Sequence, residues 1–363
     1  MAELVDARDL KSLIRMGVRV RVPLQLLYEF RWTMQKKRLM VIDALNQFLR
    51  AYIVNPTLST NGDPIGGTVG FLKILQKLCR EIKPDRVVIC WDGKGGSRKR
   101  KLVNKNYKAG RKPLRLNRGI KNLTDEQELQ NKVWQQVRLI DYLNNFPISQ
   151  LMVEDIEADD VISYVCQLQD FNGWQKVIIS SDKDFYQLLD DETVVYRPIQ
   201  KEVLNKKMII EKHGVHPTNF ALARAIVGDK SDNLDGIKGV GLPTIAKRLS
   251  FLAEEKTYTI PEVIDYCKNV NSSLKTYSSI VDGVAVVEEN YKLMQLYSPS
   301  ISVQNKTKIK YVIRNTDFSL DKTTTSGMML EDGIGNTSWI DLFIAFKNIV
   351  LKNKGEKNEF HSI

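Results

Sequence analysis

The sequence predicts an α/β fold, with a central and mostly parallel sheet that carries helices on both faces. Up to about residue 200, short apolar runs alternate with helical patterns, which is the order of elements in a parallel α/β sheet. Beyond residue 200 the pattern becomes mainly helical. Two apolar runs end in a carboxylate, at Asp43 and Asp92, and open α/β sheets form their binding crevice at strand ends.

Through the first 200 residues, the predicted strands and helices follow one another in order. We expect strands near 38–43, 86–91, 149–153, 176–180 and 193–196. We expect helices near 44–54, 66–82, 126–145, 158–169 and 183–189. The segment 66–82 carries apolar residues at helical spacing, which predicts a helix packed against the core.

The region after residue 200 contains a glycine-rich turn between two predicted helices. Pro217 is expected to open the first helix, and Gly236–Gly241 precedes a second helix at Pro243–Leu252. His213 and His216 lie three residues apart among helix-forming residues. We place both on a helix surface and do not expect them to bind a metal, because three histidines in the chain are too few for a His-rich site.

Both ends of the chain are harder to interpret. The run Val18–Pro23 alternates like a strand but has no evident partner, and strong patterning begins only after Met34. Our hypothesis is that Met34 or Met40 lies close to the natural start. Near the other end, the small polar segment Thr323–Gly327 predicts a loop. Trp339–Leu351 predicts an amphipathic helix, followed by a charged tail.

The charge balance indicates a polyanionic partner. The 363 residues carry a formal net charge of +11, and a basic protein with an internal acidic cluster fits a polyanion held by basic walls. A basic protein without such a partner is the alternative. The four cysteines lie far apart without CxxC spacing, which argues against zinc or disulfides and favours a reducing compartment. No apolar run is long enough to span a membrane.

Acidic residues gather in three clusters besides the two strand ends. Such a set would repel itself strongly unless divalent cations neutralised it. Oxygen ligands of this kind suit Mg²⁺ or Mn²⁺ rather than zinc. The nine candidate ligands are Asp43, Asp92, Glu157, Asp159, Asp160, Asp182, Asp184, Asp229 and Asp232.

The spacing within each cluster predicts its geometry. Glu157 and Asp160 should share a helix face one turn apart, although helix capping is an alternative role for acids at a helix start. The pair Asp182 and Asp184 follows a predicted strand. The pair at 229 and 232 has the spacing of one helical face.

A basic stretch runs from Lys94 to Lys121. It holds twelve lysines and arginines, no acidic residue, and one aromatic side chain, Tyr107. Such a stretch repels itself and is expected to become ordered when a polyanion binds. It can supply phosphate contacts, and Tyr107 could stack on a base. A solvated basic loop is the alternative.

Together these motifs resemble the 5′-nuclease (flap endonuclease) family, especially its stand-alone phage and bacterial 5′–3′ exonucleases. The resemblance covers about residues 37–255 and depends on the order and spacing of the segments. It implies a PIN-like α/β domain, a basic helical arch and a DNA-binding helix–three-turn–helix. The matching segments are Val41-Ile42-Asp43-Ala44, Trp91-Asp92-Gly93, Tyr107-Lys108-Ala109-Gly110-Arg111, Glu157-Ala158-Asp159-Asp160, Ser181-Asp182-Lys183-Asp184 and Gly228-Asp229-Lys230-Ser231-Asp232-Asn233.

The resemblance also implies a mechanism, which is phosphodiester hydrolysis with two Mg²⁺ or Mn²⁺ ions. Lys108 and Arg111 would grip the scissile phosphate and stabilise the transition state. One ion would be held by Asp92, Glu157, Asp159 and Asp160, with Asp43 acting mainly through water, and the other by Asp182, Asp184, Asp229 and Asp232. Further DNA contacts would come from Arg98, Lys99, Arg100, Lys101 and Tyr107 in the arch, and from Lys238, Gly239, Gly241, Lys247 and Arg248 at the helix–three-turn–helix, where a K⁺ ion could also bind.

The implied role is primer removal and flap cutting in DNA replication or repair, in a phage or a bacterium. The expected partner is branched or 5′-ended DNA, with RNA–DNA hybrids as a further substrate, and the protein is expected to be a monomer in the bacterial or infected-host cytoplasm. The implied domains are a leader (1–36), a nuclease domain (37–200) with an arch at about 94–145, a helical region (201–300) with the helix–three-turn–helix at about 228–252, and an extension of unknown role (301–363).

Two alternatives belong to other classes. A PIN-type ribonuclease shares the acidic crevice but is usually much shorter, without the basic arch or the glycine turn. A non-catalytic protein that binds DNA structures would be expected to lack some carboxylates, whereas all nine are present here.

Overall fold

A computed structural model describes residues 36–111, 120, 123–334 and 339–360. The chain divides into two units, Met1–Lys36 and Lys37–Ile363, and the account below concerns the second. The predicted strand-like run Val18–Pro23 and the candidate start Met34 lie outside the described residues. Met40 lies inside the first strand and is fully buried.

The core of the second unit is a six-stranded sheet with the order β3-β2-β1-β4-β5-β6. Strands β1 to β5 pair in parallel, and β6 pairs antiparallel with β5. The strands span Arg38–Asp43 (β1), Arg86–Trp91 (β2), Ser149–Met152 (β3), Gln175–Ile179 (β4), Thr193–Arg197 (β5) and Glu202–Leu204 (β6). The central strands are apolar over most of their length because helices cover both of their faces.

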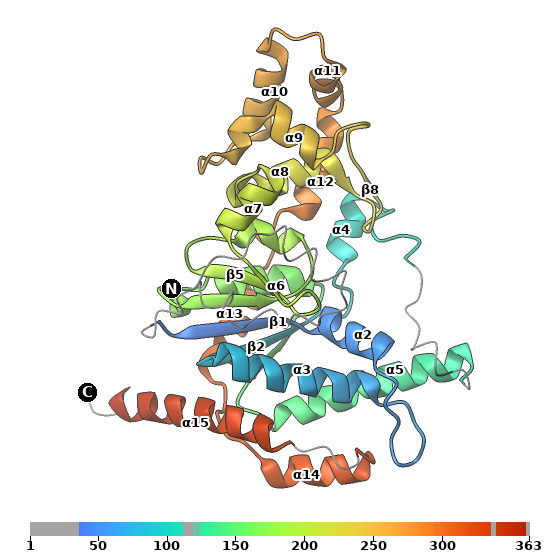
Figure 1. Cartoon of the computed structure of the whole chain (residues 1–363), viewed down its shortest axis with the longest axis vertical. Coiled ribbons are helices and arrows are strands. Elements are labelled where there is room, and N and C mark those ends of the chain that lie inside the picture. Colours follow the sequence, from blue (N-terminus) through green and yellow to red (C-terminus); the bar gives the residue numbers. More distant parts are fainter. Residues whose placement is uncertain (1–35, 112–119, 121–122, 335–338, 361–363) are drawn as a thin grey trace, which may run out of the picture. The chain divides into compact units, whose positions relative to one another are not determined.

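Helices lie on both faces of this sheet (Figure 1). One face carries α2 (Ala44–Val54), α3 (Gly66–Ile82) and α5 (Asp125–Asn144), and the other carries α6 (Ala158–Cys166). Alternate β1 residues such as Leu39 and Val41 pack into the same hydrophobic cluster as Val161 of α6. These features confirm the predicted α/β class and the mostly parallel sheet.

The helical region follows β6. It contains the short hairpin β7 (Gly228–Asp229) and β8 (Leu234–Asp235) between two helices, and α12 returns against α8. The helices are α7 (Lys206–His213), α8 (Pro217–Val227), α9 (Leu242–Arg248), α10 (Ile260–Asn269), α11 (Lys275–Asp282) and α12 (Val284–Met294). The His213 ring packs against Tyr186 and Phe220. The His216 side chain caps α8 and is buried, so its expected place on the helix surface is wrong.

The C-terminal part adds three helices: α13 (Val303–Arg314), α14 (Lys322–Glu331) and α15 (Ile340–Phe360). The prediction of a loop at Thr323–Gly327 is wrong, because Asp321 caps α14 by accepting a hydrogen bond from the Thr324 amide and Thr325 is buried. The predicted last helix is also too short, since α15 continues to Phe360. No helix within the described ranges is long and apolar enough to cross a membrane.

Three other helix predictions differ in type or length. The helix expected at 158–169 ends at Cys166 and is followed by a 3-10 turn, η2 (Gln169–Phe171). The segment expected at 183–189 is a 3-10 helix, η3 (Asp184–Leu188). The helix expected to reach Leu252 ends at Arg248 before η4 (Ser250–Ala253). Short 3-10 turns at helix ends and connections are common, and the 3.6-residue pattern does not distinguish them from α-helix.

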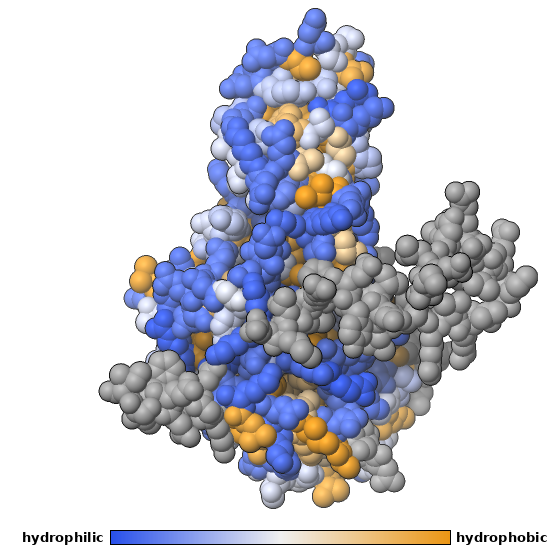
Figure 2. Space-filling view, turned by 60° about the vertical axis from the view of Figure 1, so that its left-hand side comes forward, coloured by the Kyte–Doolittle hydropathy of each residue, from blue (hydrophilic) through white to orange (hydrophobic). Residues whose placement is uncertain are grey.

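Most large hydrophobic side chains are buried between these layers. Figure 2 shows a mainly hydrophilic surface on the face in view, with hydrophobic residues in small separate groups. Scattered exposed hydrophobic residues of this kind are normal for a folded protein. The remaining helix, α4 (Arg98–Val103), has no buried residues and lies beside the β7–β8 hairpin (Figure 1).

Candidate active site

The carboxyl ends of β1, β2 and β4 meet at one edge of the sheet because these strands are parallel neighbours. Asp43 is the last residue of β1, and Asp92 follows β2 directly. Asp43 is buried, caps α2 through the Asn46 amide, and accepts a hydrogen bond from Ser180 Oγ at 3.0 Å. Ser180 follows β4, and its side chain therefore connects the end of β4 to the end of β1.

The start of α6 supplies three further carboxylates. Asp92 Oδ1 accepts a hydrogen bond from the Ala158 amide at 2.8 Å, so Asp92, not Glu157, satisfies the helix start. Glu157 makes no side-chain capping bond. Capping therefore does not explain Glu157, whose side chain faces the basic residues of α4 and the turn after it.

Asp182 and Asp184 lie in the turn after β4. The Asp182 amide donates to Ser180 Oγ at 3.1 Å, and the Asp184 amide donates to Asp182 Oδ1 at 2.9 Å. These local bonds fold the turn so that both carboxylates belong to the same strand end, as their spacing predicted.

The prediction that Asp229 and Asp232 share a helical face is wrong. They lie on the β7–β8 hairpin, where Asp229 Oδ1 accepts hydrogen bonds from the amide and hydroxyl of Ser231, both at 2.7 Å. Gly228 forces this geometry, because its φ is +79° and a Cβ there would lie 2.4 Å from the Gly236 nitrogen. An i, i+3 spacing fits a tight turn as well as a helix.

Three carboxylates near the strand ends have raised pKa values. Burial raises the pKa of Asp43 to about 7, with a contribution from the negative charge of Asp92. Burial, followed by the charges of Asp182 and Asp43, raises the pKa of Asp159 well above its usual range. Burial and Asp182 raise the pKa of Asp184 to about 7. These mutual effects link the clusters into one region of excess negative charge.

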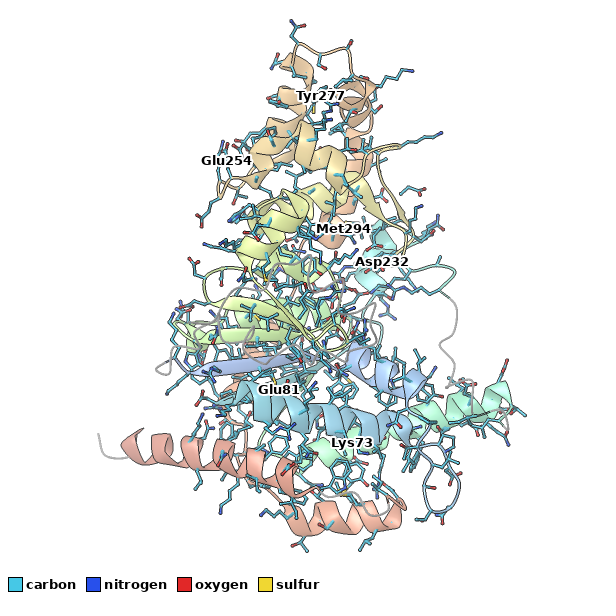
Figure 3. All side chains as sticks on the ribbon, viewed as in Figure 1. Lys73, Glu81, Asp232, Glu254, Tyr277 and Met294 are labelled. Carbon is cyan, nitrogen blue, oxygen red and sulfur yellow. The ribbon has the colours of Figure 1, made fainter. Side chains whose placement is uncertain are left out.

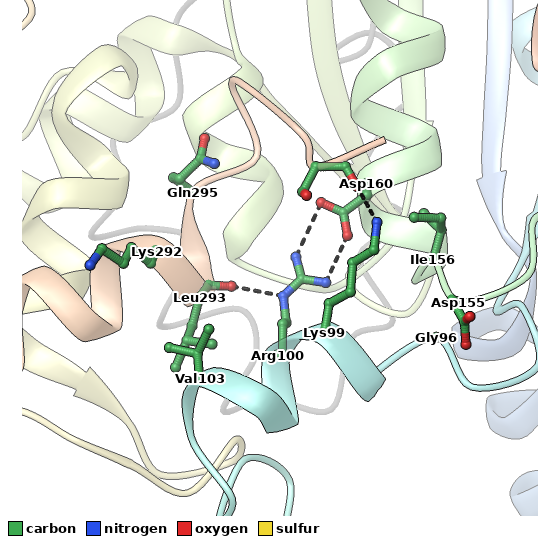
Figure 4. Close-up of a pocket in the computed structure, with 11 residues that line it drawn as sticks. Gly96, Lys99, Arg100, Val103, Asp155, Ile156, Asp160, Lys292, Leu293 and Gln295 are labelled. Carbon is green, nitrogen blue, oxygen red and sulfur yellow. Dashed lines mark hydrogen bonds and ion pairs between the residues drawn. The ribbon is translucent and has the colours of Figure 1, made fainter. Parts of the chain in front are cut away.

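Arg100 of α4 lies between two of the predicted metal ligands, Glu157 and Asp160, and Figure 4 shows its contact with Asp160. Its guanidinium donates to both oxygens of Asp160, at 2.7 and 3.2 Å, and to Glu157 Oε2 at 2.9 Å. Its Nε donates to the Leu293 carbonyl at 2.9 Å. Only 12% of the Arg100 side chain is exposed, so in this arrangement Arg100 is not available for the DNA contact predicted for it.

The turn after α4 corrects a second expectation. Nothing in the sequence near Lys108 pairs with it, yet Lys108 Nζ lies 2.9 Å from Glu157 Oε1. The Tyr107 ring is 3% exposed beside Met294, and its hydroxyl donates to Glu157 Oε2 at 3.2 Å. The ring is therefore not accessible for the predicted stacking on a base.

Arg111 completes the set of basic partners. It forms an ion pair with Asp232, and the Lys108 amide donates to the Asp232 carbonyl at 2.8 Å. Figure 3 shows Asp232 beside this segment. Four bases between Arg98 and Arg111 thus pair with acids distant in sequence. The expectation that the stretch becomes ordered when a polyanion binds stays a prediction. Residues 112–119 lie outside the described ranges.

Arg224 of α8 is a site residue that the sequence did not indicate. Its Nε and Nη2 lie 3.3 Å from Asp184 Oδ1, and its guanidinium also forms an ion pair with Asp229. A lone arginine five residues before an aspartate matches no local pairing rule. The role of Arg224 becomes visible because α8 packs against η3 and brings Arg224 to Asp184.

The donor set fits a divalent metal, although basic side chains hold part of it. Within the described part of the chain, no three acidic, histidine or cysteine side chains stand ready to bind an ion as they are. Ion pairs engage Glu157, Asp160, Asp184, Asp229 and Asp232. The other four carboxylates form no ion pair with a described residue. They offer only oxygen donors, which Mg²⁺ and Mn²⁺ prefer. These four are Asp43, Asp92, Asp159 and Asp182.

The glycine turn lies between the hairpin and α9. Gly239 has a φ of +79° with open space where a Cβ would stand, and Lys238 and Lys247 are exposed. Gly241 precedes α9, and Arg248 ends it. The glycine turn and α9 therefore present exposed backbone and two lysines directly after the hairpin that carries Asp229 and Asp232.

Comparison with known proteins identifies the family. Residues 38–214 match the family model described as "5'-3' exonuclease, N-terminal resolvase-like domain". The 5′–3′ exonuclease of Aquifex aeolicus is 32% identical over 209 residues, covering 57% of this chain and 67% of that protein. The chain belongs to the 5′–3′ exonuclease family. The predicted family and its nuclease class are therefore confirmed.

Some relatives in this family are much longer than this chain. DNA polymerase I of Caldicellulosiruptor bescii is 31% identical over 245 residues, which cover 66% of this chain but only 26% of the polymerase. Among solved structures, the 5′-exonuclease of bacteriophage T5 with bound zinc has a TM-score of 0.63 at 17% identity, covering 77% of this chain and all of that one. The T5 D15 flap endonuclease with DNA and metal ions has a TM-score of 0.58 at 18% identity, covering 82% of this chain and all of that one. This likeness supports the fold.

Proposed function

We propose that this chain is a metal-dependent 5′–3′ exonuclease and structure-specific flap endonuclease that hydrolyses DNA phosphodiesters. The observation that carries the proposal is the meeting of nine carboxylates with Arg100, Lys108 and Arg111 at one sheet edge. Such an edge can bind cations through its acids and phosphate through its bases. Family membership supports the same reaction class.

The proposed cofactors are two Mg²⁺ or Mn²⁺ ions, which would polarise the phosphate and activate water when bound. Asp43, Asp92, Asp159 and Asp182 have no ion pair with a described residue and would contribute first. Glu157, Asp184, Asp229 and Asp232 complete the proposed set. Asp160 is not among the ligands that we expect to bind an ion first, because both of its oxygens already bind Arg100.

Lys108 and Arg111 are the proposed phosphate-binding residues. Lys108 is held at the site by its backbone, through the bond from its amide to Asp232, while its ammonium rests on Glu157. Arg111 is the more exposed of the two, at 51% against 22% for Lys108. Both can therefore neutralise charge on a phosphate at the acidic edge.

The duplex is proposed to lie along the glycine turn, with Lys238, Gly239, Gly241, Lys247 and Arg248 near its backbone. Exposed amides in such a turn can bind phosphate, and a K⁺ ion could bind there. Arg98, Lys99 and Lys101 add positive charge on α4. The proposed partner is branched or 5′-ended DNA, and RNA–DNA hybrids are a further proposed substrate. We propose that the protein acts as a monomer in the cytoplasm.

A cleavage assay with a matched pair of variants tests this proposal. Asp182→Asn removes a proposed ligand, whereas Asp191→Asn changes an exposed aspartate, 82% accessible, in the turn before β5 at the opposite sheet edge. The substrates are a 5′-flap DNA and a single-stranded RNA, each with Mg²⁺ and with EDTA. Binding is measured separately in Ca²⁺.

We expect Mg²⁺-dependent cutting of the flap by wild type and Asp191→Asn. Asp182→Asn should bind DNA normally but cut it orders of magnitude more slowly. Cutting of RNA alone would favour the PIN-type ribonuclease. Binding without any cleavage by wild type would favour the non-catalytic DNA-binding protein.

A further inference from the structure

The strongest unassigned feature near the site is the position of Arg224. It lies in the last turn of α8, and its side chain is 11% exposed. The guanidinium reaches Asp184 Oδ1 at 3.3 Å, the Asp229 carboxylate, and the carbonyl of Gly228 at 3.4 Å. One poorly accessible side chain thus contacts the start of η3 and the β7–β8 hairpin together.

These contacts join two segments that lie far apart in the sequence. Asp184 follows β4, and Asp229 lies 45 residues further along in the hairpin. The Asp229 oxygen that Arg224 does not hold accepts two hydrogen bonds from Ser231. The Asp229 carboxylate is consequently fixed at both oxygens.

Arg224 differs from the other basic residues of the site. Lys108 and Arg111 come from the turn after α4, and their side chains are 22% and 51% exposed, so they can turn toward a substrate. Arg224 projects from a helix that packs on η3 and α12, and its carbonyl contact holds it in place. Its geometry suits a permanent support rather than a substrate contact.

We propose that Arg224 is a positioning residue that orients Asp184 and Asp229 for the second divalent ion. The inference depends on the proposed metal-dependent function. Carboxylates that ligate metals are usually held by hydrogen bonds from neighbouring groups, and loss of such a partner typically lowers metal affinity about 10- to 100-fold. The planar guanidinium holds two carboxylates and a carbonyl with donors in a fixed fork, a geometry that the single ammonium of a lysine does not match.

The test measures Mn²⁺ binding to the full chain by electron paramagnetic resonance and by calorimetry. The variants are Arg224→Lys, which keeps the charge, and Arg224→Gln, which removes it. Arg138→Gln is the matched control, because Arg138 also contacts two carboxylates, Glu331 and Asp332, at 22% exposure and far from the site.

We expect wild type and Arg138→Gln to bind two Mn²⁺ ions. Both Arg224 variants should keep one ion at wild-type affinity and bind the other about 10- to 100-fold more weakly. Cleavage should then require a correspondingly higher Mn²⁺ concentration. Arg224→Lys keeps the positive charge at this position. If Arg224→Gln does not fold, the metal affinity of Arg224→Lys alone decides whether Arg224 positions the two carboxylates.

Wild-type affinity for both ions in Arg224→Lys would overturn the inference, since charge alone would then suffice. Tighter binding in Arg224→Gln would also overturn it, because the guanidinium would then compete with the ion. A wild-type chain that binds fewer than two ions contradicts the two-ion centre itself and so identifies failure of the proposed function.

Discussion

Replacing Lys108 by methionine separates catalysis from stability at this site. Methionine keeps most of the side-chain length but removes the ammonium that lies 2.9 Å from Glu157 Oε1. If Lys108 stabilises the transition state, the single-turnover rate should fall about 10²- to 10³-fold, the usual loss for one electrostatic stabiliser. DNA affinity should change far less.

The structure also sets the expected cost in stability. Breaking a buried ion pair costs about 3–5 kcal/mol when the remaining charge has no other partner. Glu157 keeps Arg100 at 2.9 Å and the Tyr107 hydroxyl at 3.2 Å, so the cost should be nearer that of one charged hydrogen bond, about 1.5–3 kcal/mol. For a unit of this size that lowers Tm by about 2–4 °C.

The assay combines single-turnover cleavage of a 5′-flap DNA with binding in Ca²⁺ and thermal unfolding in EDTA. Lys105→Met is the matched control, because Lys105 is an exposed lysine in the same turn and should affect the rate only slightly. A wild-type rate in Lys108→Met, or a rate loss equal to its loss of affinity, would refute the catalytic role. Either result would make Lys108 an ordinary partner of Glu157.

Three further predictions concern charge, backbone and metal. Neutralising Lys99 and Lys101 together should flatten the slope of log affinity against log salt by about 1.8 if both contact duplex phosphates, and an unchanged slope would exclude them from the interface. Gly228→Ala should destabilise the fold by more than about 4 kcal/mol, since its Cβ would clash with backbone. Gly239→Ala, with the same φ of +79° but open space, should cost only about 1–2 kcal/mol; equal unfolding free energies would contradict the clash. Mg²⁺ at a hundred times its Kd should stabilise the wild-type protein by about 2.7 kcal/mol, and an equal rise in Tm for Asp182→Asn would show that the ion binds elsewhere.

Strand and helix positions in the α/β part were predictable because they depend on local patterns. The apolar runs of β1 and β2 are buried on both faces, so successive residues of each run are apolar and the strand can be recognised from the sequence. The error at Thr323–Gly327 has the opposite cause. Its small polar residues favour a loop locally, but the Asp321 cap and burial of Thr325 stabilise a helix. Whether residues 200 and 300 divide separate domains stays a prediction.

The convergence of carboxylates could be predicted because parallel strands end at the same sheet edge. Their basic partners could not, because local rules for ion pairs reach only about four residues along a helix or one residue across a strand pair. Arg100 and Asp160 are 60 residues apart, and Arg111 and Asp232 are 121 apart. The sequence therefore shows an acid-free basic stretch and separate acidic clusters, while the fold lets each neutralise part of the other. An exposed guanidinium such as Arg111 can exchange Asp232 for a phosphate at little cost, because exposed ion pairs contribute about 0–1 kcal/mol. The side chains of Arg100 and Arg224 are only 12% and 11% exposed, so the same exchange would leave poorly accessible carboxylates without partners. The contribution of these two arginines to the site is to hold it together.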